Sequence, residues 1–455
     1  MARAGAARGE IQMTEGSLWK NILIFSIPLV FSQLLQVMFN MADVAVVGKF
    51  ASDTALGSVG STSTLVTLFT GFLIGMGNGV NVRVAQHLGA QHREETSRAV
   101  HTAFLLCLLA GVGIMVLCLA LAANMLEMLH TKDDLLPGAV LYFRIYALGM
   151  PALGIFNFGN AVLSANGDTK RPLLYLTIAG ILNVILNLFF VIVCKMAADG
   201  VALASVISQY VSAILVVWHM MRLNDACKFY FQRLRFHGDE VGRILGLGVP
   251  AGIQHMIFAI ANLFIQAAVN SFDSTMVSGN AAAANTDTII YNIMMAFYTA
   301  CSTFMGQNWG AGHKKRMMDS YLISLFYAFA VAAVLGVAFY FAGRPFLYVF
   351  TNSADVVEAG MQRMKIMCFS YAISAFMDNT IAACRGLGRT IVPTVVVIMG
   401  SCVFRVIWVY TIFAHYHTIP SLYLLYAFSW TITAAAEIVY FLHCFRKLRL
   451  VPETA

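Results

Sequence analysis

Four carboxylate side chains and one guanidinium group, each inside or at the end of a long apolar stretch, are the main candidates for function in this chain. An ionised residue in the middle of a membrane span costs a contested ~2.5–3.5 kcal/mol or more, so such residues are functional candidates by default. They can bind and release protons, hold a cation, or pair with one another. The five residues are Asp43, Asp287, Asp378, Glu437 and Arg405.

Asp43 is the strongest candidate for carrying an ion. It lies about 23 residues from the start of the first apolar stretch, which is roughly 34 Å of helix at 1.5 Å per residue. This length places the carboxylate toward the outer end of that helix. The alternative interpretation is an interfacial aspartate that merely ends the helix.

Two amides share one helix face further along the chain. Asn183 and Asn187 are four residues apart, so they project from the same side of the helix expected over 173–194. One interpretation is a polar site that faces the interior of the protein. The alternative is that the two amides hydrogen-bond across helices and hold the bundle together.

The other candidate ionisable groups fall in the second half of the chain. We expect Asp287 and Asp378 either to attract a cationic substrate or to pair with Arg405. His255 is a further candidate for binding a substrate or a second ion. Glu437 lies nearer the basic end of its helix, and we interpret it as structural.

The composition requires lipid as the solvent around most of the chain. Hydrophobic residues make up 59% of the 455 residues and charged residues 11%, and the mean hydropathy is +0.75. Soluble domains carry about 25% charged residues. Apolar runs of about 20 residues, enough to cross roughly 30 Å of hydrocarbon as a helix, recur throughout. We therefore expect an all-α integral membrane protein with twelve transmembrane helices at 20–42, 55–80, 98–122, 138–161, 173–194, 200–221, 244–270, 279–304, 318–342, 358–384, 391–413 and 419–444.

The two halves of the chain repeat one pattern. Four positions return 221 residues later: Gln86 as Gln307, Gly89 as Gly310, Ala90 as Ala311 and His92 as His313. Pro28 also returns, as Pro250. Duplicated halves in lipid are typical of transporters that move one half against the other.

A basic connector separates the two halves. The expected domains are a segment 1–19, a six-helix bundle 20–221, the connector 222–243, a second six-helix bundle 244–445 and a tail 446–455. Because six is an even number, both bundles start on the same side of the membrane. We therefore expect a pseudo-two-fold axis along the membrane normal.

Lysine and arginine gather on one side of the expected spans. That side holds 21 of the 29 basic residues, including those of both termini and the connector. The positive-inside rule then places both termini in the cytoplasm, as in a multi-pass protein of the plasma (inner) membrane. The net charge of +7 reflects this bias, and we expect no nucleic-acid partner.

The motifs of common enzyme classes are absent from the sequence. The chain contains no P-loop, no HExxH and no CxxC, and its nine cysteines lie mostly in apolar spans. We interpret these cysteines as small buried hydrophobic residues. We expect neither an enzyme nor a bound metal or cofactor, apart from a proton or sodium as coupling ion.

Several segments together resemble the multidrug and toxic compound extrusion (MATE) family. They are 40–48, the paired loops 86–90 and 307–311, and the paired helix entries 167–172 and 385–388, the last with Pro393. The resemblance covers roughly residues 14–447. It implies two helix bundles that form a V. It also implies export of organic, often cationic, compounds driven by inward flow of protons or sodium.

The resemblance also suggests a cation site around Asp43. In relatives with a well-defined site in the amino-terminal half, the positions of Asn183, Asn187 and Ser205 surround the matching aspartate. Those relatives often carry aspartate at the position of Asn187 and threonine at that of Ser205. One carboxylate among amides and a hydroxyl is a weaker oxygen cage for a hard cation. We therefore favour proton over sodium coupling.

The second half departs from the pattern of those relatives. Arg405 stands at the position that corresponds to Asn183. Some relatives carry a carboxylate a few residues beyond His255, where this chain has Phe258. Their aspartate in the tenth span is displaced by about one turn from Asp378. We therefore do not transfer the relatives' sodium site to this half.

Some residues are candidates for gating or for helix packing. Gly71, Gly75 and Gly79 follow at spacings of four, which is typical of close helix packing. A proline can kink a helix. We expect the paired loops to end their helices with a glycine C-cap, and a gating role is the alternative. The gating or kink candidates are Pro28, Gln86, Gly89, Gln307 and Gly310.

These observations predict a secondary antiporter that works by alternating access and exports small organic, lipophilic cationic compounds as a monomer. A lipid-linked oligosaccharide flippase of the same superfamily is the alternative. It would favour a cavity rich in basic residues, whereas the embedded charge here is mixed. A membrane-embedded enzyme is an alternative of another class, and it would need paired catalytic groups at helical spacing, which we do not find.

Overall fold

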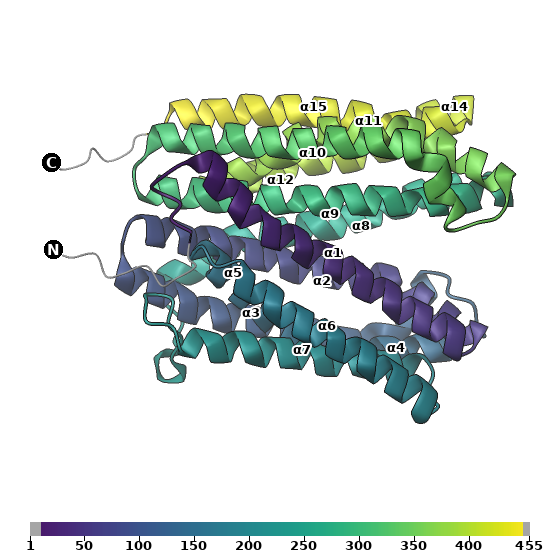
Figure 1. Cartoon of the computed structure of the whole chain (residues 1–455), viewed down its shortest axis with the longest axis horizontal. Coiled ribbons are helices and arrows are strands. Elements are labelled where there is room, and N and C mark those ends of the chain that lie inside the picture. Colours follow the sequence, from purple (N-terminus) through teal and green to yellow (C-terminus); the bar gives the residue numbers. More distant parts are fainter. Residues whose placement is uncertain (1–10, 449–455) are drawn as a thin grey trace. The chain divides into compact units, whose positions relative to one another are not determined.

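The computed structural model describes residues 11–448, which form helices joined by short loops, with no strand in that range (Figure 1). The first half contains α1 (Leu18–Phe50), α2 (Asp53–Gly89), α3 (Arg93–Met128), α4 (Leu136–Ala147), α5 (Met150–Ala165), α6 (Lys170–Leu188), η1 (Phe189–Val193) and α7 (Ala198–Met221). After the short η2 (Phe231–Arg233) come α8 (Gly238–Val269), α9 (Ser274–Gly310), α10 (Lys314–Tyr348), α11 (Ala354–Gly386), α12 (Ile391–Val397), η3 (Ile398–Val403), α13 (Phe404–Trp408), η4 (Val409–Phe413), α14 (Ala414–Tyr416) and α15 (Ile419–Arg446).

The described chain has eleven helical segments that are long and apolar enough to cross a membrane, or up to twelve if the bent pair α4–α5 counts as one. The chain bends by 44° at the break between these two helices. Pro151 lies in the first turn of α5 and lacks the N–H that would bond to the carbonyl of Ala147. The predicted all-α membrane class is confirmed, and the expected span 138–161 is a broken one.

Two of the spans contain wide, π-type helical turns. α6 passes into η1, and α12, η3, α13, η4 and α14 together form the single span Ile391–Tyr416. Such turns shift side chains out of the regular helical register and are frequent at functional sites. η1 begins shortly after Asn187, and η3 ends shortly before Arg405.

The chain forms two compact units whose boundaries fall inside helices. The first comprises residues 11–12 and 31–256, and the second comprises 13–30 and 257–448. The start of α1 therefore belongs to the second unit, and the start of α8 to the first. Pro28 and Pro250 lie inside these two helices shortly before the boundaries, where a missing hydrogen bond permits a kink. The domain boundaries that we drew at the connector stay a prediction.

In the first unit, α2 and the start of α8 approach each other at glycines. A Cβ atom added at Gly75 would lie 2.3 Å from the backbone nitrogen of Gly252. One added at Gly79 would lie 2.5 Å from the backbone nitrogen of Gly248. Only glycine permits this distance between backbones, so the close-packing face predicted for α2 is confirmed.

A buried ion pair joins the same two helices. Arg83 Nε and Nη2 donate hydrogen bonds to the two carboxylate oxygens of Glu240 at 2.8 and 2.7 Å. His87 Nε2 lies 3.0 Å from Glu240 Oε1. All three residues are buried, and the two-pronged geometry fixes the start of α8 against α2.

In the second unit, Arg316 of α10 holds the segment that precedes α1. Its guanidinium donates to the backbone oxygens of Met13, Glu15 and Gly16 at 3.1, 3.2 and 3.0 Å. Asn308 of α9 donates to the Met13 oxygen at 3.2 Å. In the first unit, Arg83 of α2 therefore holds the start of α8, and in the second unit Arg316 of α10 holds the segment before α1. Both α8 and α1 continue into the other unit.

The paired loops end α2 and α9 as predicted, but the glycines Gly89 and Gly310 are not themselves the left-handed cap residues. α2 ends at Gly89 and α9 at Gly310, and the residues that follow both keep right-handed backbone angles. The left-handed residues are Gln91, with φ 56°, and Gly312, with φ 76°. The backbone N–H of His92 donates to the carbonyl of His87, and that of His313 donates to the carbonyl of Asn308. These bonds close the two helix ends.

Candidate functional site

Asp43 contacts two polar side chains from two other helices of the first unit, and a third polar side chain joins these two. Asn187 Nδ2 donates to Asp43 Oδ1 at 2.5 Å, and Ser205 Oγ donates to Asp43 Oδ2 at 3.4 Å. Asn187 Nδ2 also donates to Asn183 Oδ1 at 3.2 Å, and Asn183 Nδ2 donates to Ser205 Oγ at 3.3 Å. We refer to these four residues as the Asp43 cluster.

The helices position the Asp43 cluster by simple geometry. Asp43 lies in the last two turns of α1, and Asn183 and Asn187 stack one turn apart on α6. Ser205 lies near the start of α7. The two amides and the hydroxyl are buried, whereas Asp43 is partly exposed.

A glycine on α6 allows α1 to come this close. A Cβ atom added at Gly180 would lie 1.8 Å from the ring of Phe39. Gly180 is three residues before Asn183, and Phe39 is four residues before Asp43. The contact between ring and backbone therefore lies about one turn from the polar contact on both helices.

Two tyrosines of α4 were missed in the sequence analysis. Tyr142 and Tyr146 both interact electrostatically with Asp43, and their rings are stacked with centroids 6.0 Å apart. Their spacing of four residues on an apolar helix is the same signal that singled out Asn183 and Asn187.

Within residues 11–448, no group of three or more His, Cys, Asp or Glu side chains could hold a metal ion. The Asp43 cluster has one carboxylate, and the hydrogen bonds that reach it come from neutral donors. Asn187 Oδ1 has no hydrogen-bond partner among the described residues. The arrangement can therefore stabilise a carboxylate with neutral donors and can rearrange when a proton makes Asp43 itself a donor.

In the second unit, Asp287 pairs with Arg363 and not with Arg405, which was one of the two roles expected for it. Arg363 Nε donates to Asp287 Oδ2 at 3.1 Å, and Nη2 donates to the same oxygen. Arg363 Nη1 donates to the hydroxyl of Tyr423 at 3.0 Å and to the backbone oxygen of Asn280 at 3.3 Å. This partly buried network joins α9, α11 and α15.

Arg405 is buried against aromatic rings. Its guanidinium carbon lies 4.4 Å from the ring centroid of Tyr426, 5.6 Å from that of Trp430 and 5.7 Å from that of Phe258. Its Nε donates to Ser429 Oγ at 3.3 Å, and its Nη2 has no hydrogen-bond partner in the described part of the chain. The aromatic faces attract the buried cation electrostatically.

Asp378 and His255, the other two candidates for binding a substrate or a second ion, lie in different parts of the structure. Asp378 on α11 interacts electrostatically with Arg385 and Arg405. His255 belongs to the part of α8 in the first unit, and its Cβ would be 3.1 Å from a Cβ atom added at Gly71 of α2. His255 therefore lies on the close-packed face of α2 and α8.

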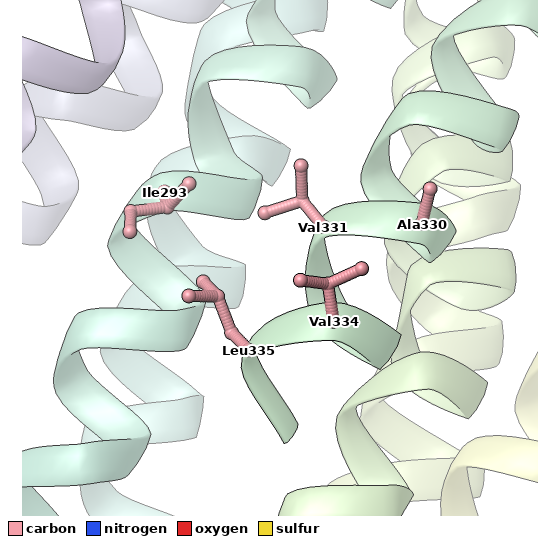
Figure 2. Close-up of a pocket in the computed structure, with 5 residues that line it drawn as sticks. All are labelled: Ile293, Ala330, Val331, Val334 and Leu335. Carbon is pink, nitrogen blue, oxygen red and sulfur yellow. The ribbon is translucent and has the colours of Figure 1, made fainter. Parts of the chain in front are cut away.

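An open apolar hollow lies on α9 and α10 of the second unit. Figure 2 shows the five side chains that line it, all hydrophobic: Ile293, Ala330, Val331, Val334 and Leu335. None of the candidate ionisable residues lines this hollow. It suits contact with lipid chains and offers no polar group that could orient a substrate.

The comparisons with known proteins identify the family. The MatE family model matches residues 28–189 and again 250–411, which confirms the internal repeat. The chain is 28% identical to the probable multidrug resistance protein YpnP of Bacillus subtilis, over 79% of this chain and 80% of that protein. It is 23% identical to a protein of Shewanella oneidensis named FAD transporter, over 74% of this chain and 75% of that protein.

Solved structures share the fold. A MOP superfamily transporter from Pyrococcus furiosus matches with a TM-score of 0.90 at 20% identity, over 98% of this chain and 100% of that chain. An outward-facing multidrug resistance MATE transporter matches with a TM-score of 0.89 at 20% identity, over 97% and 99% of the two chains. Because the family model covers both halves of the sequence, this chain belongs to the MATE family, a family of multi-pass membrane transporters and not of enzymes.

Proposed function

We propose that this protein exports small organic, mainly lipophilic cationic, compounds in exchange for protons, with Asp43 as the carrier. The observation that supports the proposal best is the contact of Asp43 with the amide of Asn187 and the hydroxyl of Ser205. Uptake of a proton removes the charge of Asp43 and weakens both bonds, because they are charge-assisted. Relatives named as probable multidrug resistance proteins support organic compounds as the substrate class.

The composition of the Asp43 cluster supports a proton over sodium. A hard cation needs several oxygen ligands, preferably with more than one negative charge. Here one carboxylate accepts hydrogen bonds whose donors, Asn187 Nδ2 and Ser205 Oγ, point toward it. A proton needs only the carboxylate itself.

The proposed cycle uses the proton to change the packing of the last turns of α1. The proton binds Asp43 from outside, the substrate leaves outward, and the proton is released inside after the two halves exchange access. One charge that crosses a potential of 100 mV supplies ~2.3 kcal/mol, before any concentration gradient. Cytoplasmic termini, an inner-membrane location and a monomeric state belong to the same proposal.

Transport into energised everted vesicles tests the proposal. We would follow uptake of a fluorescent lipophilic cation by wild type and Asp43→Asn, under a proton gradient alone or a sodium gradient alone. Asp133→Asn is the matched control, because Asp133 is exposed and loses the same charge. The expected result is uptake driven by protons in wild type and in the control, and none in Asp43→Asn.

Each other outcome contradicts a stated part of the proposal. Uptake with sodium alone would support an antiporter but would show that the coupling ion is sodium and not the proton. Proton-driven uptake that survives in Asp43→Asn would exclude Asp43 as the carrier. No uptake under either gradient would overturn the substrate class and favour the flippase, which labelled lipid-linked sugars would then test.

A further inference from the structure

The carboxyl group of Glu437 is buried without a partner. Its side chain lies in α15 with 0% of its surface exposed, and neither Oε1 nor Oε2 has a hydrogen-bond partner among residues 11–448. The residue is nine positions before the end of α15 at Arg446, which is about 14 Å along the helix axis. We interpreted Glu437 as structural, yet it makes none of the hydrogen bonds that a structural carboxylate needs.

Few charged groups face Glu437. On α11, which packs along α15, Arg385 and Cys384 interact electrostatically with it. The neighbouring segments α12 and η3 contain no charged residue. Arg405 of α13 is bonded to Ser429, which lies two turns before Glu437 on α15. Among residues 11–448, Arg385 is therefore the basic side chain whose charge acts on Glu437, without a hydrogen bond or ion pair between them.

Arg385 also interacts with a second carboxylate. Asp378 lies seven residues before it on α11, so the two residues share one face of that helix. Arg385 thus interacts with carboxyl groups on two helices of the second unit. A small change in the packing of α11 against α15 can shift its interaction from one to the other.

An ionised carboxylate with no hydrogen bond in an apolar interior costs several kcal/mol, whereas the neutral acid costs far less. In a membrane span such a group is retained for function more often than for stability. We infer that Glu437 is a second proton-binding group of this transporter, protonated in the conformation described and deprotonated to water when Arg385 turns toward it. This inference rests on the proposed proton-driven function. It adds a site in the second unit.

Proton counting in proteoliposomes tests the inference. With the full-length protein and a lipophilic cation as substrate, we would measure protons moved per substrate from an enclosed pH dye and a labelled substrate. Glu437→Gln keeps the shape and removes the titration, and Glu437→Asp restores a carboxyl group. Exposed Glu127→Gln is the matched control. We expect about a twofold lower ratio in Glu437→Gln, because one of two carriers is lost, and recovery in Glu437→Asp.

Infrared difference spectroscopy on purified protein gives an independent readout. The wild type should show a protonated carboxyl band that shifts in heavy water and is absent from Glu437→Gln. A wild type that moves no protons with substrate would contradict the proposed function. A wild type that moves protons, with an unchanged ratio and an unchanged carboxyl band in Glu437→Gln, would overturn this inference alone.

Discussion

Asn187 uses one side-chain nitrogen to reach both Asp43 Oδ1, at 2.5 Å, and Asn183 Oδ1, at 3.2 Å. The short bond goes to the carboxylate and the longer one to the neutral amide, as expected when one acceptor carries a charge. Because Asp43 is on α1 and both amides are on α6, this nitrogen links the charge of the carboxylate to the packing of two helices. A proton on Asp43, as proposed above, would therefore alter the contact between α1 and α6.

Asn187→Asp should introduce sodium dependence. A second carboxylate beside Asp43 supplies the additional charged oxygens that a hard cation prefers. Uptake of a lipophilic cation with sodium alone should become measurable in this variant. Asn224→Asp is the control, because Asn224 is exposed in the connector. If Asn187→Asp still responded to protons alone, the composition of the Asp43 cluster would not determine the ion.

Gly180→Ala should destabilise the contact between α1 and α6. The new methyl group would overlap the ring of Phe39, and such overpacking costs ~1–3 kcal/mol. We expect a lower melting temperature in detergent and weaker transport, with partial recovery when Phe39→Leu is added. Gly113→Ala is the control, because a Cβ atom there meets nothing within 4 Å. Equal effects at both glycines would argue against a close approach of α1.

Glu240→Gln should destabilise the protein strongly. It leaves the buried guanidinium of Arg83 without its counter-charge, and breaking a buried pair in this way costs ~3–5 kcal/mol. Thermal unfolding in detergent measures the loss. Glu358→Gln breaks the exposed pair with Arg344, which is worth ~0–1 kcal/mol, and serves as the control. A similar small effect for both variants would mean that the start of α8 is held by its glycine contacts alone.

Asp287 and Arg363 should behave as a structural pair. Asp287→Asn and Arg363→Met should each lower stability, and the double variant should lose less than the sum, because no charge is then left unpaired. The measurement is a double-mutant cycle on the melting temperature, with substrate affinity determined in parallel. Additive stability losses together with a large drop in substrate affinity would instead assign Asp287 to the substrate.

Part of the candidate site could be predicted and part could not. Asn183 and Asn187 lie on one helix face because of their spacing, and the family resemblance added Ser205 and Asp43; the structure brings all four within hydrogen-bond distance. The sequence offered Arg405 as one possible partner of Asp287 and did not indicate Arg363. The bond between Asp287 and Arg363 joins residues 76 positions apart, and no local pattern encodes which of two arginines on neighbouring helices is nearer.

The sequence by itself determined the membrane class, the approximate spans, the duplicated halves and the family, because hydropathy and repeated motifs are local properties of the chain. Tertiary structure decided that α1 and α8 each pass from one unit to the other, that α8 begins against α2 through Arg83 and Glu240, and that Glu437 has no hydrogen-bond partner in the described chain. These features depend on which helix faces meet. That choice is made by close packing at positions such as Gly75 and Gly252, far apart in sequence, where backbones approach only because no side chain intervenes.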